Sequence, residues 1–149
     1  MKRAILSAAL AIALMAGVSA QDKPNFAGKW KAAGSFTAWT ITVEGSKMTV
    51  TMTVAGNSES TMYLLDGTPS KNPLDGGLAE IVMTSTWEDN VLVTTIAAPS
   101  MTRVERRSIE ADGTMKVQTT ITMMQGKPAP PPPPGAGGAQ VFKRVGEAR

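Results

Sequence analysis

Residues 39–54 read WTITVEGSKMTVTMTV, and apolar side chains alternate with threonines on both sides of a Gly-containing turn signal. Successive side chains of a β-strand point to opposite faces, so each half has one dry face and one face toward water. Threonine suits the wet face because its β-branched side chain favours the pleat while its hydroxyl meets water. The segment Glu44–Ser46 between the two halves is typical of a hairpin turn. The sequence therefore predicts a β-hairpin here.

The same period of two recurs along the chain. Strands are predicted around Trp30 and at Trp39–Val43, Met48–Val54, Ser60–Asp66, Glu80–Glu88, Val91–Ala97, Thr102–Ala111, Met115–Met123 and Gln140–Val145. Short turn signals such as Gly56-Asn57, Asp66-Gly67 and Asp112-Gly113 separate most of them. After the first 20 residues, helical spacing never extends beyond one turn. The pattern predicts an all-β meander that closes into a barrel or packs as a sandwich, because open sheet edges invite aggregation.

Two connections are longer. Residues 66–79 carry two prolines and three glycines, and are predicted to be a loop without a strand. Residues 125–140 run from five consecutive prolines into glycines, which is typical of a stiff extended rod followed by a return of the chain. This segment is interpreted either as a docking peptide for a proline-recognising domain or as a permissive hairpin tip.

The N-terminus has the layout of a secretory signal. Lys2 and Arg3 precede an apolar run from Ala4 to Val18, and small residues lead to a predicted cleavage after Ala20. The run is shorter than the roughly 20 apolar residues that a membrane span needs. Residues 21–149 are then expected to form a single exported domain, periplasmic or extracellular, without a membrane anchor. Cleavage lowers the net charge from +3 to +1, which disfavours nucleic-acid binding because that needs a concentrated basic face.

The composition excludes several kinds of chemistry. The chain has no histidine and no cysteine, so Ser-His-Asp and Cys-His triads, His or Cys metal clusters and haem ligation by either residue are excluded. The adjacent carboxylates Glu88 and Asp89 lie in a predicted turn, where solvation explains them. We expect neither an enzyme nor a bound cofactor.

The segment Gly28-Lys29-Trp30 near the start of the meander, together with Phe142-Lys143-Arg144 in the last strand, resembles the lipocalin and fatty-acid-binding superfamily, the calycins. It looks more specifically like the small exported lipocalin-like proteins of bacteria. The resemblance implies an antiparallel up-and-down barrel of about eight to ten strands. It also implies that Trp30, with Gly28, plugs the closed end and that Arg144, or Lys143, packs over the indole, a favourable cation–π contact.

The barrel interior is the candidate site. The predicted dry faces hold Trp39, Ile41, Val43, Val50, Met52, Val54, Met62, Leu64, Ile81, Met83, Trp87, Val91, Val93, Val117, Ile121 and Met123. Methionine adapts to irregular space, which suits either a filled core or a pocket for apolar guests. From the resemblance, we expect a small hydrophobic or amphipathic ligand, such as a fatty acid, with walls formed by Trp39, Met52, Met62, Met83 and Trp87.

Residues 102–111, TRVERRSIEA, would send an arginine inside in either register. A buried charge needs a partner, which could be Glu105 or the carboxylate of a ligand anchored by Arg106 or Arg107. A bulge or a wet edge that keeps both faces solvated is the alternative. The alternative function is a protein-interaction module with a filled core that acts through the loops 66–79 and 125–140.

Overall fold

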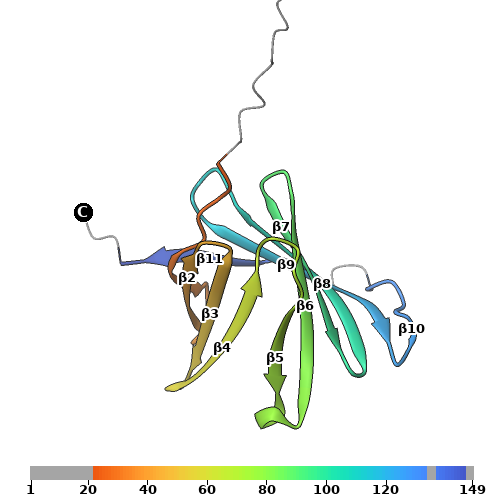
Figure 1. Ribbon diagram of the computed structural model, residues 1–149. Coiled ribbons are helices and arrows are strands. Elements are labelled where there is room, and N and C mark those ends of the chain that lie inside the picture. Colours follow the sequence, from red (N-terminus) through yellow and green to blue (C-terminus); the bar gives the residue numbers. More distant parts are fainter. Residues whose placement is uncertain (1–21, 134–136, 147–149) are drawn as a thin grey trace, which may run out of the picture.

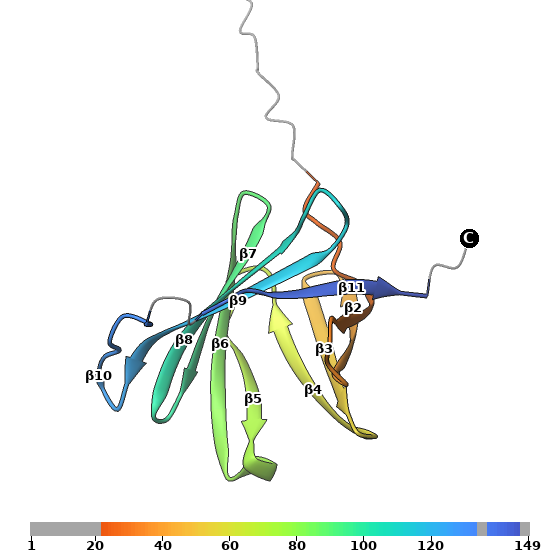
Figure 2. The same ribbon diagram turned by 180° about the vertical axis from the view of Figure 1, so that it is seen from behind.

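The computed structural model describes residues 22–133 and 137–146, and the predicted signal peptide at 1–20 lies outside the described residues. The described chain folds into an antiparallel up-and-down barrel, which confirms the predicted fold class (Figures 1 and 2). Its strands are β1 (Gly28–Ala32), β2 (Ala38–Glu44), β3 (Lys47–Val54), β4 (Asn57–Leu64), β5 (Ser70–Leu74), β6 (Ala79–Glu88), β7 (Val91–Ala98), β8 (Met101–Ile109), β9 (Met115–Met124), β10 (Lys127–Pro128) and β11 (Gln140–Val145).

The strands form one sheet in the order β4-β3-β2-β1-β11-β9-β8-β7-β6-β5, with β10 paired to β9. The edge strands β4 and β5 come together through side chains. The Asn72 side chain acts as a substitute peptide group: its Oδ1 accepts a hydrogen bond from the Met62 N–H at 2.7 Å, and its Nδ2 donates to the Met62 carbonyl at 2.9 Å. Ser70 Oγ donates to the same carbonyl at 2.9 Å. We call this junction the seam, and it almost closes the barrel.

The predicted loop at 66–79 is partly wrong, because it contains β5 and a short 3-10 turn, η1 (Asp75–Gly77). Pro73 is compatible with β5 because β5 is an edge strand that pairs only with β6. Proline has no backbone N–H, and on the side of β5 that faces away from β6 no strand of the described chain would accept a hydrogen bond from it. The segment 125–140 likewise contains the two-residue strand β10.

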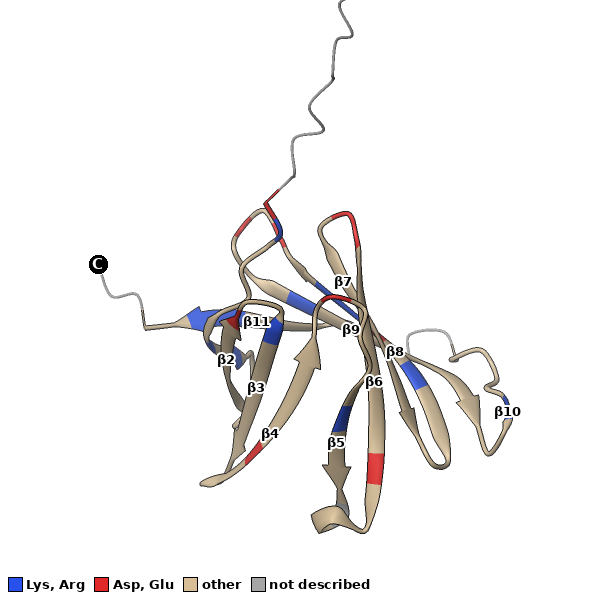
Figure 3. Cartoon of the chain, in the orientation of Figure 1, with Lys and Arg blue, Asp and Glu red and all other residues tan. Residues whose placement is uncertain are grey.

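The two ends of the barrel differ in their connecting turns. At the closed end, where the chain enters, the connections are 45–46, 65–69, 89–90 and 110–114. At the open end they are 33–37, 55–56, 75–78, 99–100 and 125–126. Acidic residues gather at the closed end, as Figure 3 shows.

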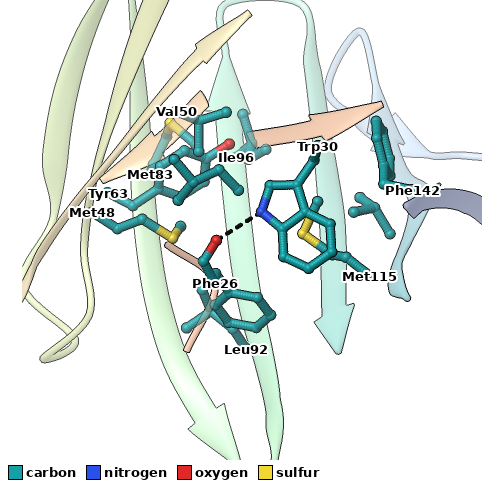
Figure 4. Packing of buried hydrophobic residues seen from close by; sticks show 12 residues of the cluster. Phe26, Trp30, Met48, Val50, Tyr63, Met83, Leu92, Ile96, Met115 and Phe142 are labelled. Carbon is teal, nitrogen blue, oxygen red and sulfur yellow. Dashed lines mark hydrogen bonds between the residues drawn. The ribbon is translucent and has the colours of Figure 1, made fainter. Parts of the chain in front are cut away.

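The closed end is plugged by Phe26 and Trp30, which are both almost fully buried (Figure 4). Trp30 Nε1 donates to the Phe26 carbonyl at 2.8 Å. The Arg144 guanidinium carbon lies 4.5 Å from the Trp30 ring centroid, and its nitrogens donate to the carbonyls of Ala27 and Asn25. Gly28 makes room for this arginine, since a Cβ there would lie 3.1 Å from Arg144 Nη1 and the backbone has a φ of 139°. Lys143 points to the other face of β11 and is exposed.

The strand register moves several predicted interior residues to the outer face. In β4 the interior residue is Tyr63, which pairs with buried Met48, so Met62 and Leu64 point outward. In β7 the interior residues are Leu92, Thr94 and Ile96, so Val91 and Val93 point outward. Both strands carry apolar residues on both faces, so the hydrophobic pattern fits either register. A shift of the strand pairing by one residue moves every interior side chain to the outer face.

Candidate functional site

Strand β8 brings three charged side chains to the interior face. Arg103, Glu105 and Arg107 pair across to the interior residues Ile96, Thr94 and Leu92 of β7. Arg106 lies on the outer face, where its Nη2 is 2.7 Å from Glu88 Oε2 and both side chains are about half exposed. The arginines on the interior face are therefore Arg103 and Arg107, and the predicted anchoring role of Arg106 has no geometric basis.

Arg107 is the most deeply buried charged residue of the described chain, with 1% of its side chain exposed. Its Nη2 donates to Glu105 Oε1 at 2.6 Å and to the Tyr63 hydroxyl at 3.5 Å, and its Nη1 lies 3.6 Å from Met48 Sδ. A buried cation needs such a partner because the interior cannot replace its hydration. Glu105 therefore serves first as the counter-ion of Arg107.

Aromatic rings surround the same guanidinium. Its central carbon lies 5.1 Å from the Tyr63 ring centroid, 5.4 Å from that of Trp39 and 5.9 Å from that of Phe26. Two buried N–H donors, Arg107 Nε and Trp39 Nε1, have no hydrogen-bond partner within the described part of the chain. The centre of the barrel is thus rich in donors and filled with side chains.

Burial governs the ionisation of this cluster. It raises the pKa of Tyr63 above its ordinary value, and the Glu105 carboxylate adds to the rise while Arg107 opposes it. Burial alone would lower the pKa of Arg107, but Glu105 and Tyr63 outweigh that effect and the pKa is raised. Arg107 therefore stays charged and Tyr63 stays neutral at physiological pH.

A cavity of about 120 Å³ lies nearer the open end. Arg103 is its one charged lining residue, and the others come from β5, β6, β7 and β8: Leu74, Ile81, Ile96, Ala98 and Met101. Within the described residues Arg103 makes no ion pair. An arginine above an apolar floor can hold an anionic head group while the floor holds a few carbon atoms.

The predicted wall residues do not form one surface. Met83 is buried at the centre, and Trp39 packs on Phe142 with ring centroids 4.3 Å apart. Trp87 stacks on Phe26 at the closed end, whereas Met52 lies near the open rim and is 38% exposed. Met62 is on the outer face. None of them lines the cavity beside Arg103.

Sequence reasoning missed Tyr63, Asn72 and Arg103 as site residues. Tyr63 was missed because its neighbours Met62 and Leu64 are both apolar, so the alternation predicted that their face of the strand, and not that of Tyr63, points to the interior. Asn72 was hidden because its segment was interpreted as a loop. For Arg103 a signal was available, since it shares a strand face with Glu105 and Arg107.

Two open grooves lie outside the interior. One, of about 670 Å³, runs beside the N-terminal segment at the closed end and includes Lys23, Leu65 and Trp87. The other, of about 400 Å³, lies between the prolines and β9 and includes Ile121, Met124, Pro130, Pro132 and Pro133. Among the described residues, β11 pairs with residues 115–117 of β9 and β10 with residues 123–124, and no strand pairs with residues 118–121 on this side.

In residues 22–133 and 137–146 no group of three or more acidic side chains is placed to hold a metal ion. The same ranges contain no helix that is long and apolar enough to cross a bilayer.

The barrel is similar to solved structures of the calycin type. A fatty acid binding protein of Schistosoma mansoni, solved with arachidonic acid, matches with a TM-score of 0.60 and 19% identity over 81% of this chain and 96% of that one. A secretory abundant heat soluble protein of Ramazzottius varieornatus matches with a TM-score of 0.60 and 12% identity over 80% and 95%. A variant of the fluorescent protein UnaG matches with a TM-score of 0.59 and 16% identity over 82% and 97%. No family model and no curated protein matches the chain. The chain therefore has a calycin-like fold, similar to that of fatty-acid-binding proteins.

Proposed function

We propose that the protein is a non-enzymatic barrel that binds a small amphipathic anion, with its head group on Arg103 and its apolar part in the adjoining cavity. The observation that carries this proposal is the position of Arg103, which lines an apolar cavity without an ion pair in the described residues. The three interior charges of β8 sum to one positive charge, because Glu105 is already paired with Arg107. One negative charge on the ligand restores neutrality. The fatty acid binding protein among the structural neighbours supports this class of ligand.

The cavity volume limits the ligand. A volume of about 120 Å³ is below the roughly 150 Å³ of a protein cavity that holds benzene, and well below the roughly 300 Å³ minimum of common ligand pockets. The centre beyond it is filled by Arg107, Trp39 and Phe142. A short-chain carboxylate fits inside, and a longer chain extends through the open end.

Isothermal titration with hexanoate and hexanol tests this proposal. Hexanoate should bind and hexanol should bind at least tenfold more weakly, because a charge-assisted hydrogen bond to the head group is worth about 1.5–3 kcal/mol. Arg103→Met should abolish the preference for hexanoate, whereas Arg106→Met, three residues along on the outer face, should preserve it. Equal binding of both ligands, or no binding of either, would refute the proposal.

We also propose that residues 1–20 are a signal peptide and that residues 21–149 act as one exported domain, in the periplasm or the medium. The charged start, the apolar run and the small residues before Gln21 support this. Sequencing the N-terminus of the protein recovered from its own cells tests it. A mature chain that starts at Gln21 is expected, and an intact Met1 would contradict export by this route.

The groove between β9 and the prolines supports a second candidate, a module that captures a protein partner through residues 125–140. Apolar side chains meet there with a stretch of the β9 edge that no strand of the described part of the chain pairs with. Replacing residues 129–138 by a short turn should then abolish capture of that partner while hexanoate binding persists. Unchanged capture would exclude this candidate.

A further inference from the structure

Two large apolar side chains project from separate turns at the open end. Phe36 in the β1–β2 connection is 94% exposed, and Leu78 in the β5–β6 connection is 91% exposed. Strand direction places both connections at the same end of the barrel, opposite the entry of the chain (Figure 1). Burial is favourable for such side chains, so their full exposure at turn tips is costly unless something covers them.

The surrounding rim is also apolar. Met52 and Val54 at the end of β3 and Met124 at the end of β9 are between 38% and 47% exposed. These residues encircle the end of the barrel at which the cavity beside Arg103 lies. The open end therefore presents apolar groups from at least four turns or strand ends rather than from one flat sheet face.

The connections at the open end carry fewer charged residues than those at the closed end. The five open-end connections contain one charged residue, Asp75, whereas the four closed-end connections contain Asp66, Asp89, Glu110 and Asp112, all acidic. Glu44 and Glu88 at strand ends are paired with Lys47 and Arg106, so the four turn carboxylates are what distinguishes the closed end (Figure 3). On the open-end strands Lys71 pairs with Glu80, and the exposed residues Glu59, Lys31 and Lys127 carry one negative and two positive charges. Together with Asp75 these charges sum to zero, which leaves Arg103 in the cavity as the uncompensated charge at this end.

We propose that the open end docks onto the surface of a zwitterionic lipid bilayer, with Phe36 and Leu78 inserted among the lipid head groups. A near-neutral rim with projecting apolar side chains matches a phosphatidylcholine surface, which has no net charge for the rim to match. Side chains carried on separate turns can insert independently into a fluid surface, whereas a rigid protein partner would need complementary pockets for each. The turns of the closed end carry carboxylates where those of the open end carry Phe36 and Leu78, and placing a charged side chain among lipid is costly, so the open end is the one that faces the membrane. This docking does not require the interior ligand.

Flotation with phosphatidylcholine vesicles tests the proposal. The protein should float with the vesicles, and the double substitution Phe36→Ser and Leu78→Ser should lower the partition coefficient about a hundredfold, roughly tenfold for each buried side chain. The matched control is Val43→Ser with Val145→Ser, because both valines are exposed and lie at the closed-end ends of β2 and β11. The control should float like the wild type, and circular dichroism should show that both variants are folded.

Three results would overturn the proposal. They are absence of flotation by the wild type, equal flotation of the wild type and the Phe36/Leu78 variant, and binding that occurs only when the vesicles contain anionic lipid. If sedimentation shows a dimer that the Phe36/Leu78 variant loses while vesicles bind neither protein, the rim is instead a contact between two copies. Arg103→Met should float normally, so failure of the ligand proposal would leave this result distinguishable.

Discussion

Neutralising Glu105 tests whether Arg107 is a buried charge that depends on one counter-ion. In Glu105→Gln the side chain keeps its shape and one oxygen that can accept from Arg107, so mainly the charge is lost. The Arg107 side chain is 1% exposed, that of Glu105 is 12% exposed, and the two are joined at 2.6 Å. With charge centres about 4 Å apart and an effective dielectric constant of about 20, the lost attraction is about 4 kcal/mol.

This estimate agrees with the roughly 3–5 kcal/mol lost when one partner of a buried ion pair is removed. A domain of this size loses about 3–5 °C in melting temperature per kcal/mol, so Glu105→Gln should melt about 12–20 °C below the wild type. Thermal and urea unfolding followed by tryptophan fluorescence measure the change. The free energy of unfolding from the urea curve provides the direct comparison.

Arg106→Gln is the matched control, because it breaks a similar Arg–Glu contact on the outer face, with partners 45% and 57% exposed. An exposed pair of this kind contributes about 0.2–1 kcal/mol. The double variant Glu105→Leu with Arg107→Leu should be closer to the wild type than Glu105→Gln, since no buried charge is left. If Glu105→Gln and Arg106→Gln lower the free energy of unfolding by the same small amount, buried Arg107 does not depend on Glu105 as its counter-ion.

Three further predictions concern the seam, the plug and the chain's one tyrosine. Asn72→Ala should cost about 1–3 kcal/mol and remove the protection of the Met62 amide against hydrogen exchange, because the Met62 N–H loses its acceptor while the Met62 carbonyl keeps only the Ser70 hydroxyl. A protected Met62 amide in that variant would show that the seam is held in another way. Arg144→Met should release the segment at residues 22–27 to proteolysis, since the guanidinium donates to two of its carbonyls, and mass spectrometry of the fragments reads this directly. Unchanged cleavage kinetics would count against this role. Ultraviolet absorbance should show Tyr63 ionising above its ordinary pKa of 10.0, and stability should fall as the pH rises through that higher value, because the unfolded chain releases the proton first. Ionisation at the ordinary pKa in the folded protein would contradict the burial argument.

The barrel was predictable because the period of two is strong in this chain. Threonine alternates with apolar residues in β2 and β3, where one register places every large apolar side chain on the interior face. In β4 and β7 apolar residues occupy both faces, so the hydrophobic pattern alone could not decide the register, and pairing with neighbouring strands decides it. Asn72 was not predictable because its role depends on two edge strands meeting after the meander has almost closed.

The interior charges were partly predictable. Alternation in TRVERRSIEA required an arginine inside, and the structure identifies Arg107 and also Arg103. The predicted wall could not be placed, because a list of inward side chains does not say which of them fill the centre and which surround a cavity. That distinction depends on how Trp39, Phe142 and Arg107 pack against each other across the barrel.

The seam also makes the chain a candidate for circular permutation. Strands β4 and β5 share no backbone ladder, and the connection 65–69 between them is the point where the sheet order begins and ends. Lys29 of β1 lies directly opposite Val145 of β11, so the two ends of the described barrel are already neighbours. Joining those ends with a short linker and opening the chain at 66–69 would give a protein in which every ladder between successive strands is preserved. Its new termini would flank the side chain of Asn72, where a reporter group would detect any opening of the wall.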